Sequence, residues 1–167
     1  MIFINISIVG CSKSPQQKQA IEQTNSEDIK FLKGKNINLD SIICDTKDIN
    51  VIYLFNYYDC ETCIHNGFTI VNQIDNQTQK GYVKVIESRC PEINSLQKRE
   101  RYYEYIYSDK NDDIRKKLKY SPTPVLLLLD DSKKIIDALI TTNLQQNEVN
   151  QFIHKCHNSF INHHSDK

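Results

Sequence analysis

The sequence predicts an α/β domain in which helices flank a central mixed β-sheet. Residues 51–55 and 125–129 are unbroken apolar and aromatic runs, which are typical of interior strands covered on both faces. Segments with helical spacing separate the predicted strands, and this alternation implies parallel βαβ crossovers. A tight turn at residues 130–132 then joins two strands directly, so we expect an antiparallel hairpin near the end of the sheet.

The first half of the predicted sheet begins with the strand at residues 51–56. A helix follows, because apolar positions recur at helical spacing at Ile64, Phe68, Val71 and Ile74. Gly81 suits the end of that helix, and the β-prone residues 82–87 form the next predicted strand. Pro91 suits the first turn of a short helix that runs to about residue 101.

The second half of the sheet is predicted from three further strands. They lie at residues 103–107, 125–129 and 134–139. Asp112 or Asp113 is expected to cap a helix that runs to about residue 120, and the prolines at 122 and 124 end it. A terminal helix closes the domain with one apolar face, made of Val149, Phe152, Ile153, Cys156 and Phe160.

The composition is that of a globular domain without an excess of either charge. Hydrophobic residues make up 39% of the 167 residues, which is enough to build a core. Lys+Arg and Asp+Glu both total 21, so the formal net charge is zero. A nucleic-acid-binding domain usually carries a basic excess, so no nucleic-acid partner is expected. We interpret the charged clusters at 98–101 and 115–117 as solvated helix faces.

The N-terminal residues predict a membrane anchor. Residues 1–10 are apolar and end in a small residue before Cys11, and a polar stretch follows. Ile8-Val9-Gly10-Cys11 resembles a bacterial lipobox. The resemblance implies a signal segment at 1–11, a lipid on Cys11 that holds the protein at a membrane, and a flexible tether at 12–27. The domain itself would then span residues 28–167.

Two features near the N-terminus leave room for other interpretations. No Lys or Arg precedes the apolar run, which is short for a signal peptide, and a start codon assigned too late would explain both. The alternative is a buried first strand in which Cys11 is a core residue. Within the domain, two apolar patches around Gly34 predict a peripheral hairpin or a strand followed by a turn at 28–44.

Six cysteines are present, and only Cys60 and Cys63 are close in sequence. Their Cys-X-X-Cys spacing lies between a predicted strand and a predicted helix, which favours a redox-active pair. The alternatives are a structural disulfide and half of a zinc site. A structural zinc site needs four ligands, and the sequence has no second Cys-X-X-Cys, so no metal is expected there.

The remaining cysteines and histidines are interpreted more simply. Cys44, Cys90 and Cys156 are expected to be small core residues, and a disulfide between Cys44 and Cys90 stays open. His154 and His157 could share one helix face, but Cys156 points elsewhere and the C-terminal tail is expected to fray, so no metal is expected there. No cofactor is expected.

A strand, then Cys60-Glu61-Thr62-Cys63 at a helix start, then Thr123-Pro124 before a late strand, resembles the thioredoxin superfamily. The strand and helix between residues 81 and 101 are similar to the insertion of envelope redoxins of the TlpA type. The resemblance implies that Pro124 is a cis-proline opposite the cysteine pair and that Thr123 offers backbone hydrogen bonds to a substrate chain. It also implies that Tyr58, with Tyr57, contacts substrate, although simple packing at the strand end is an equal alternative.

The chemistry of a helix N-terminus explains the spacing of the pair. Cys60 would face unpaired backbone N–H groups and the positive end of the helix dipole, which favour thiolate over thiol. Cys63 lies less than one turn later, so it can attack a mixed disulfide at Cys60 and release the substrate. Asp59 and Glu61 place negative charge beside Cys60 and oppose the dipole. The sequence therefore does not decide whether the pair reduces or oxidises its substrates.

The sequence thus predicts a thiol–disulfide oxidoreductase, with Cys60 and Cys63 as the catalytic pair. Its expected partners are protein thiol or disulfide substrates and a redox partner that the sequence does not identify. The anchor and the disulfide chemistry together indicate the bacterial cell envelope, the periplasm, and cysteines of other exported proteins as substrates. The rival hypothesis is a redox-inactive lipoprotein that uses the same fold as an interaction module. Peroxide reduction is a weaker third hypothesis, because the local motif differs from that of peroxide-reducing relatives.

Overall fold

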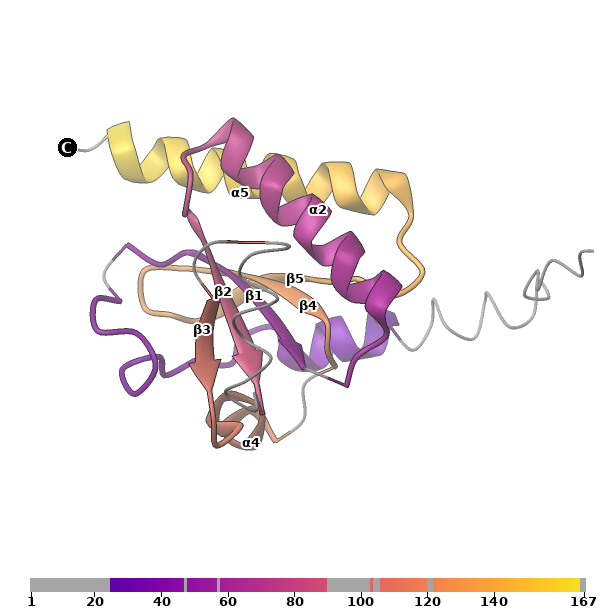
Figure 1. The fold of residues 1–167 in the computed structure, drawn as a ribbon. Helices are drawn as coiled ribbons and strands as arrows, with labels where there is room; N and C mark the ends of the chain where they lie inside the picture. Colours follow the sequence, from indigo (N-terminus) through magenta and orange to yellow (C-terminus); the bar gives the residue numbers. More distant parts are fainter. Residues whose placement is uncertain are drawn as a thin grey trace, which may run out of the picture.

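A computed structural model describes residues 25–46, 48–56, 58–89, 103, 106–119 and 122–165. Within these ranges, five strands form one mixed sheet in the order β3-β2-β1-β4-β5 (Figure 1). The strands are β1 (Val51–Asn56), β2 (Val83–Ser88), β3 (Ile106–Asp109), β4 (Val125–Leu129) and β5 (Ile135–Ile140). β1, β2 and β3 run parallel, whereas β4 is antiparallel to both β1 and β5. The crossovers and the closing hairpin are therefore those that the sequence predicts.

Helices cover both faces of this sheet. α2 (Glu61–Gln77) and α5 (Gln146–Ser165) cross the same face, as Figure 1 shows. A helix at residues 25–32 and the short α4 (Asp113–Leu118) contribute Leu32, Ile114 and Leu118 to the core on the opposite face. None of the helices within the described ranges combines the length and the apolar character that a membrane crossing requires.

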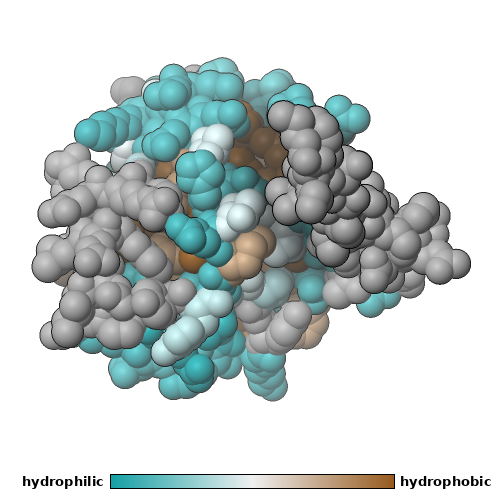
Figure 2. Space-filling model, turned by 45° about the vertical axis from the view of Figure 1, so that its right-hand side comes forward, coloured by the Kyte–Doolittle hydropathy of each residue, from teal (hydrophilic) through white to brown (hydrophobic). Residues whose placement is uncertain are grey.

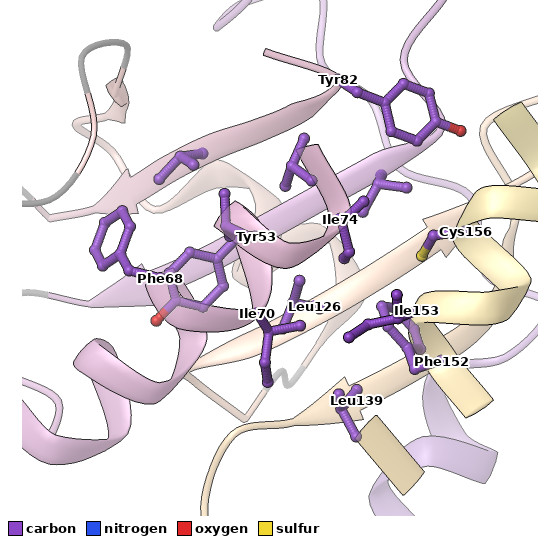
Figure 3. Packing of buried hydrophobic residues seen from close by; sticks show 14 of the residues in the cluster. Tyr53, Phe68, Ile70, Ile74, Tyr82, Leu126, Leu139, Phe152, Ile153 and Cys156 are labelled. Carbon is purple, nitrogen blue, oxygen red and sulfur yellow. The ribbon is translucent and has the colours of Figure 1, made fainter. Parts of the chain in front are cut away.

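The central strands owe their position to residues that are apolar on both faces. Every residue of β1 and of β4 is buried. Tyr53 points toward α2 and packs against Phe68 with ring centroids 5.3 Å apart (Figure 3). Phe55 packs against the same ring at 5.5 Å. Ile52 and Leu54 point to the other face and join the second core. β1 is the central strand of the five, between β2 and β4, so the chain that leaves its C-terminal end starts from the middle of the sheet.

The segment at residues 28–44 differs from the strand or hairpin that its apolar patches predict. Ile29 and Leu32 lie in the helix at 25–32, because their spacing of three places both toward the core. Gly34 follows with a φ of +86°, a conformation that glycine adopts without steric cost. The chain then runs beside the hairpin and pairs with it through a single bridge between Asn36 and Lys134, which backbone hydrogen bonds of the flanking residues support. Residues 25–27, at the end of the predicted tether, are helical, and the predicted signal segment with Cys11 lies outside the described residues.

Most other predicted elements are present with shifted ends. β3 begins at Ile106 and not at residue 103, because the buried Tyr103 turns its hydroxyl to Asp75 at 2.6 Å instead. Asp112 precedes α4, but with a φ of 59° its side chain makes no capping hydrogen bond. The carboxylate of Asp109 caps the helix instead and accepts hydrogen bonds from the N–H groups of residues 113 and 114. The helix predicted from Pro91 lies outside the described residues. β2 is internal to the sheet, and β3 takes the edge.

Candidate redox site

The candidate site lies where the buried β1 gives way to α2. Cys60 is the N-cap residue of α2, with extended backbone angles, and its sulfur accepts the N–H of Cys63 at 3.1 Å. Its carbonyl accepts the N–H of Ile64 at 3.0 Å, which begins the helical bonding pattern. The apolar side chains that follow, including Phe68 and Val71, hold the helix on the sheet. The first turn of α2 is thereby fixed at the end of a central strand.

Cys60 and Cys63 form a disulfide, with their Cα atoms 5.2 Å apart. Cys60 is exposed, whereas Cys63 is half-buried. The sulfur at the helix start therefore meets solvent first, and the second sulfur lies behind it. This is the arrangement that an attacking and a resolving cysteine require.

A cis peptide bond joins Thr123 to Pro124, directly before β4. β4 pairs with β1, so this bond lies at the same end of the sheet as the disulfide. Two side chains connect the cis-proline loop, residues 122–124, to the turn with the cysteines. Asp59 accepts the hydroxyl hydrogen of Thr123 at 2.9 Å, and the hydroxyl of Thr141 lies 3.0 Å from the carbonyl of Cys63 and 3.3 Å from that of Pro124.

Three solved structures share this arrangement of strands and helices. One, described as a thioredoxin-like superfamily protein, SPOA0173, is 14% identical, with a TM-score of 0.52 over 75% of this chain and 93% of that chain. A thio-disulfide isomerase from Thermus thermophilus is 12% identical, with a TM-score of 0.52 over 74% of this chain and 96% of that one. A Chlorobium tepidum protein assigned as a thiol:disulfide interchange protein, DsbE, is 15% identical, with a TM-score of 0.51 over 75% and 91%.

The chain has a thioredoxin-like fold. At such low identity the likeness establishes the fold alone, and the chemistry has to be argued from the residues of this chain. No family model matches the sequence, and no curated protein matches it. The predicted fold class is therefore confirmed, with the cysteine pair at the helix start and the cis-proline at the facing end of β4.

The acidic residues beside the pair differ in their surroundings. The Asp59 carboxylate is half-buried and accepts two hydrogen bonds, from Thr123 and from the N–H of Asn56. The hydrogen bond to Asp112 raises the pKa of the Arg115 guanidinium, burial opposes this, and the negative charges of Asp112 and Asp59 raise it further. The two hydrogen bonds of the guanidinium go to the carboxylate of Asp112. Glu61, by contrast, is exposed in the first turn of α2.

A buried tyrosine supports the first turn of α2 from below. Tyr53 on β1 is fully buried, and its hydroxyl donates to the carbonyl of Ile64 at 3.1 Å. Burial raises the pKa of Tyr53, and the nearby Asp59 raises it further, so the phenol stays protonated. The ring passes directly beneath Gly67, where a Cβ atom would overlap it. Only glycine permits this close approach of helix and strand.

The predicted substrate-contact residue Tyr58 is 78% exposed, beside the cysteine pair. Tyr57 lies outside the described residues. Figure 2 shows the side of the molecule on which α2 begins. Hydrophilic residues dominate its coloured surface, and hydrophobic ones are visible mainly in a recess between them.

The other cysteines divide into two kinds. Cys156 on α5 is fully buried among apolar residues, and burial raises the pKa of its thiol (Figure 3). Cys44 is exposed and free, so its predicted place in the core is wrong. It lies in the loop before β1, and its neighbour in sequence, Ile43, is the buried residue. Cys90 lies outside the described residues. Among the residues described, no three His, Cys, Asp or Glu side chains are grouped as a metal would require.

Sequence reasoning did not find the two bridges to the cis-proline loop. Asp59 was expected only as a charge that opposes the dipole, and Thr141 was not singled out. Their partners lie 64 and 78 residues away, so no local pattern marks them. A threonine directly after an apolar strand was the one available signal for Thr141.

Proposed function

We propose that this protein is a thiol–disulfide oxidoreductase, with Cys60 as the attacking and Cys63 as the resolving cysteine. The single observation that carries the proposal is the Cys60–Cys63 disulfide at the start of α2, at the same end of the sheet as the cis bond before Pro124. Solved structures with this fold include a thio-disulfide isomerase, which supports the same reaction class. The helix N-terminus supplies N–H groups and a dipole that stabilise a thiolate on Cys60.

The reaction proceeds through two exchange steps. In the reducing direction, the Cys60 thiolate attacks one sulfur of a substrate disulfide and expels the other as a thiolate. The Cys63 thiolate then attacks the Cys60 sulfur of the mixed disulfide, which expels the second substrate thiolate and forms the Cys60–Cys63 disulfide. Two electrons pass to the substrate, and a redox partner must return two electrons to the pair. The oxidising direction is the reverse of these steps.

The proposed substrates are protein disulfides or thiols, presented as extended chains. Pro124 lacks an N–H and shapes the groove, whereas Thr123 offers its backbone groups to a substrate chain. Tyr58 adds an exposed aromatic surface beside Cys60. Because an extended chain binds through backbone hydrogen bonds, the site would accept many sequences around a cysteine.

We also propose that the protein works in a bacterial cell envelope and acts on exported proteins. The support is the lipobox-like sequence that ends at Cys11, together with the persistence of disulfides outside the cytosol. Mass spectrometry of the native N-terminus tests this part alone. A lipid on Cys11 supports it, and an unmodified N-terminus at Met1 contradicts it.

The experiment for the activity is reduction of an insulin-type disulfide by the full chain, with a partner reductant in excess. We expect turnover in the wild type and none in Cys60→Ser. Reduced Cys63→Ser, mixed with the substrate disulfide after the reductant has been removed, should accumulate a mixed disulfide that non-reducing gel electrophoresis detects. Cys44→Ser, which changes an exposed cysteine elsewhere, is the matched control and should leave the rate unchanged.

A folded wild type that exchanges with neither dithiol nor disulfide substrates would overturn the proposal. That result would favour the rival hypothesis of an interaction module with the same fold.

A further inference from the structure

Asp59 hydrogen-bonds to two segments that lie far apart in the sequence. Its Oδ2 accepts from the N–H of Asn56 at 2.7 Å, and its Oδ1 accepts from the hydroxyl of Thr123 at 2.9 Å. The first bond belongs to the turn that presents Cys60. The second reaches the cis-proline loop, 64 residues later. The carboxylate therefore joins the two halves of the proposed site.

The turn before Cys60 is closed without the bond to Thr123. The N–H of Asp59 donates to the carbonyl of Asn56 at 3.0 Å, and the N–H of Tyr58 donates to the side-chain oxygen of Asn56 at 3.0 Å. Together with the bond from Asn56 to Asp59, these interactions define the turn locally. The hydrogen bond to Thr123 consequently acts on the position of the loop and not on the shape of the turn.

A second bridge lies on the other side of the disulfide. Thr141 donates its N–H to the carbonyl of Pro124 at 3.0 Å, and its hydroxyl lies 3.0 Å from the carbonyl of Cys63. The cis-proline loop is thus held at two points. Thr141 fixes it beside the half-buried Cys63, and Asp59 fixes it beside the exposed Cys60.

We infer that Asp59 is a positioning residue, which holds the cis-proline loop against Cys60 so that a bound disulfide is aligned with the attacking sulfur. The inference rests on the proposed function and adds to it the part of the chain that aligns substrate and nucleophile. Hydrogen bonds to a carboxylate are stronger than neutral ones, and misplacement of reacting groups by about 1 Å costs roughly 100-fold in rate.

The test compares two changes at Thr123 in the full chain. Thr123→Val removes the hydroxyl and keeps the shape, whereas Thr123→Ser keeps the hydroxyl. We expect kcat/KM with a disulfide-bonded model peptide to fall about tenfold in Thr123→Val, and Thr123→Ser to restore it to within about threefold of the wild type. The pH profile of Cys60 alkylation by iodoacetamide should be the same in all three proteins, because no charge has changed.

Hydrogen exchange of the oxidised proteins provides a readout that does not need turnover. The peptides that contain Asn56 and Thr123 should exchange about fivefold faster in Thr123→Val than in Thr123→Ser or the wild type, because the hydrogen bond between Asp59 and Thr123 holds both segments. If the wild type shows no turnover, the proposed function fails. Hydrogen exchange then decides by itself whether Asp59 holds the cis-proline loop. If Thr123→Val does not fold, Thr123→Ala, which also lacks the hydroxyl and changes no charge, takes its place in every comparison.

Three results would overturn the inference. One is exchange and kcat/KM within twofold of the wild type in Thr123→Val. Another is an equal loss in Thr123→Ser, which would assign the effect to the shape of the side chain. The third is a shifted alkylation profile in Thr123→Val, which would mean that the loop acts on the thiolate and not on alignment.

Discussion

The side chain of Thr141 and the backbone of Cys63 are joined by a hydrogen bond of 3.0 Å, although the residues are 78 positions apart. Thr141 follows β5 and is fully buried, so water cannot replace this bond if it is lost. The fold therefore holds the proposed resolving cysteine by its backbone carbonyl, and its sulfur takes no part in this bond.

Replacing Thr141 by valine should destabilise the protein. The valine has the same shape but leaves two buried carbonyls with one donor fewer, at a cost of about 1–3 kcal/mol in the free energy of unfolding. Urea denaturation of the oxidised protein measures this. Thr142→Val, at the neighbouring half-buried position, is the control and should cost less than about 0.5 kcal/mol. A cost below that value for Thr141→Val would refute the argument.

Gly67→Ala should destabilise the protein even though alanine favours helices. Alanine gains about 1 kcal/mol in helix propensity, but its Cβ atom would overlap the ring of Tyr53, and overpacking costs about 1–3 kcal/mol or more. We expect a net loss of at least about 1 kcal/mol, measured by thermal or urea unfolding. The control is Asn72→Ala on the exposed side of the same helix, which should be neutral or stabilising. A stabilised Gly67→Ala protein would mean that the ring moves aside without cost.

The elements that could be predicted from the sequence are those whose apolar residues follow one clear pattern. β4 spans Val125–Leu129 as predicted, because five consecutive apolar residues before a polar turn permit only an interior strand. α2 was predictable for the same reason, since its apolar stripe is regular and ends before Gly81. Cys60 and Cys63 were placed correctly because their motif lies between these two unambiguous elements.

The parts that could not be read depend on contacts between distant segments. The helix at 25–32 has only Ile29 and Leu32 toward the core, and two apolar residues suit a strand or a helix equally. Asp109, Asp112 and Asp113 are all chemically suited to cap α4, and only the path of β3 selects Asp109. The bridge from Asp59 to the cis-proline loop likewise exists only once β1 and β4 are paired.

Acid should weaken the attachment of α5 to β5. Asp137 is buried at 9% exposure and accepts from Lys33 at 2.8 Å and from Lys155. Burial alone would raise the pKa of Asp137, but the bonds from Lys155 and Lys33 outweigh it and lower the pKa below 3.8. A carboxylate with a lowered pKa stabilises the fold fully above its ordinary value and loses that stabilisation as the pH falls through the lowered value.

Urea unfolding between pH 7 and pH 2 tests this with Asp137→Asn. At neutral pH the variant should be less stable by about 1–2 kcal/mol, a modest cost because both lysines reach solvent. The gap to the wild type should begin to narrow as the pH falls below the ordinary pKa of 3.8, and it should close below the lowered pKa, where the folded wild type is also protonated. Asp40→Asn in an exposed loop is the control, with no such convergence. A gap that stays constant down to pH 2 would show that the ion pairs do not set the acid dependence.

The thiols of Cys44 and Cys156 should differ sharply in reactivity although both are free. Cys44 is exposed, whereas Cys156 has no exposed surface, and burial raises the pKa of its thiol, so little thiolate forms. In the oxidised native protein we expect iodoacetamide to modify Cys44 at least about 100-fold faster than Cys156, as followed by peptide mass spectrometry. In urea the two rates should converge, because the unfolded chain exposes both sulfurs. Cys44→Ser should leave the slow rate at Cys156 unchanged. Comparable native rates at the two positions would mean that α5 opens from the sheet on the timescale of the labelling.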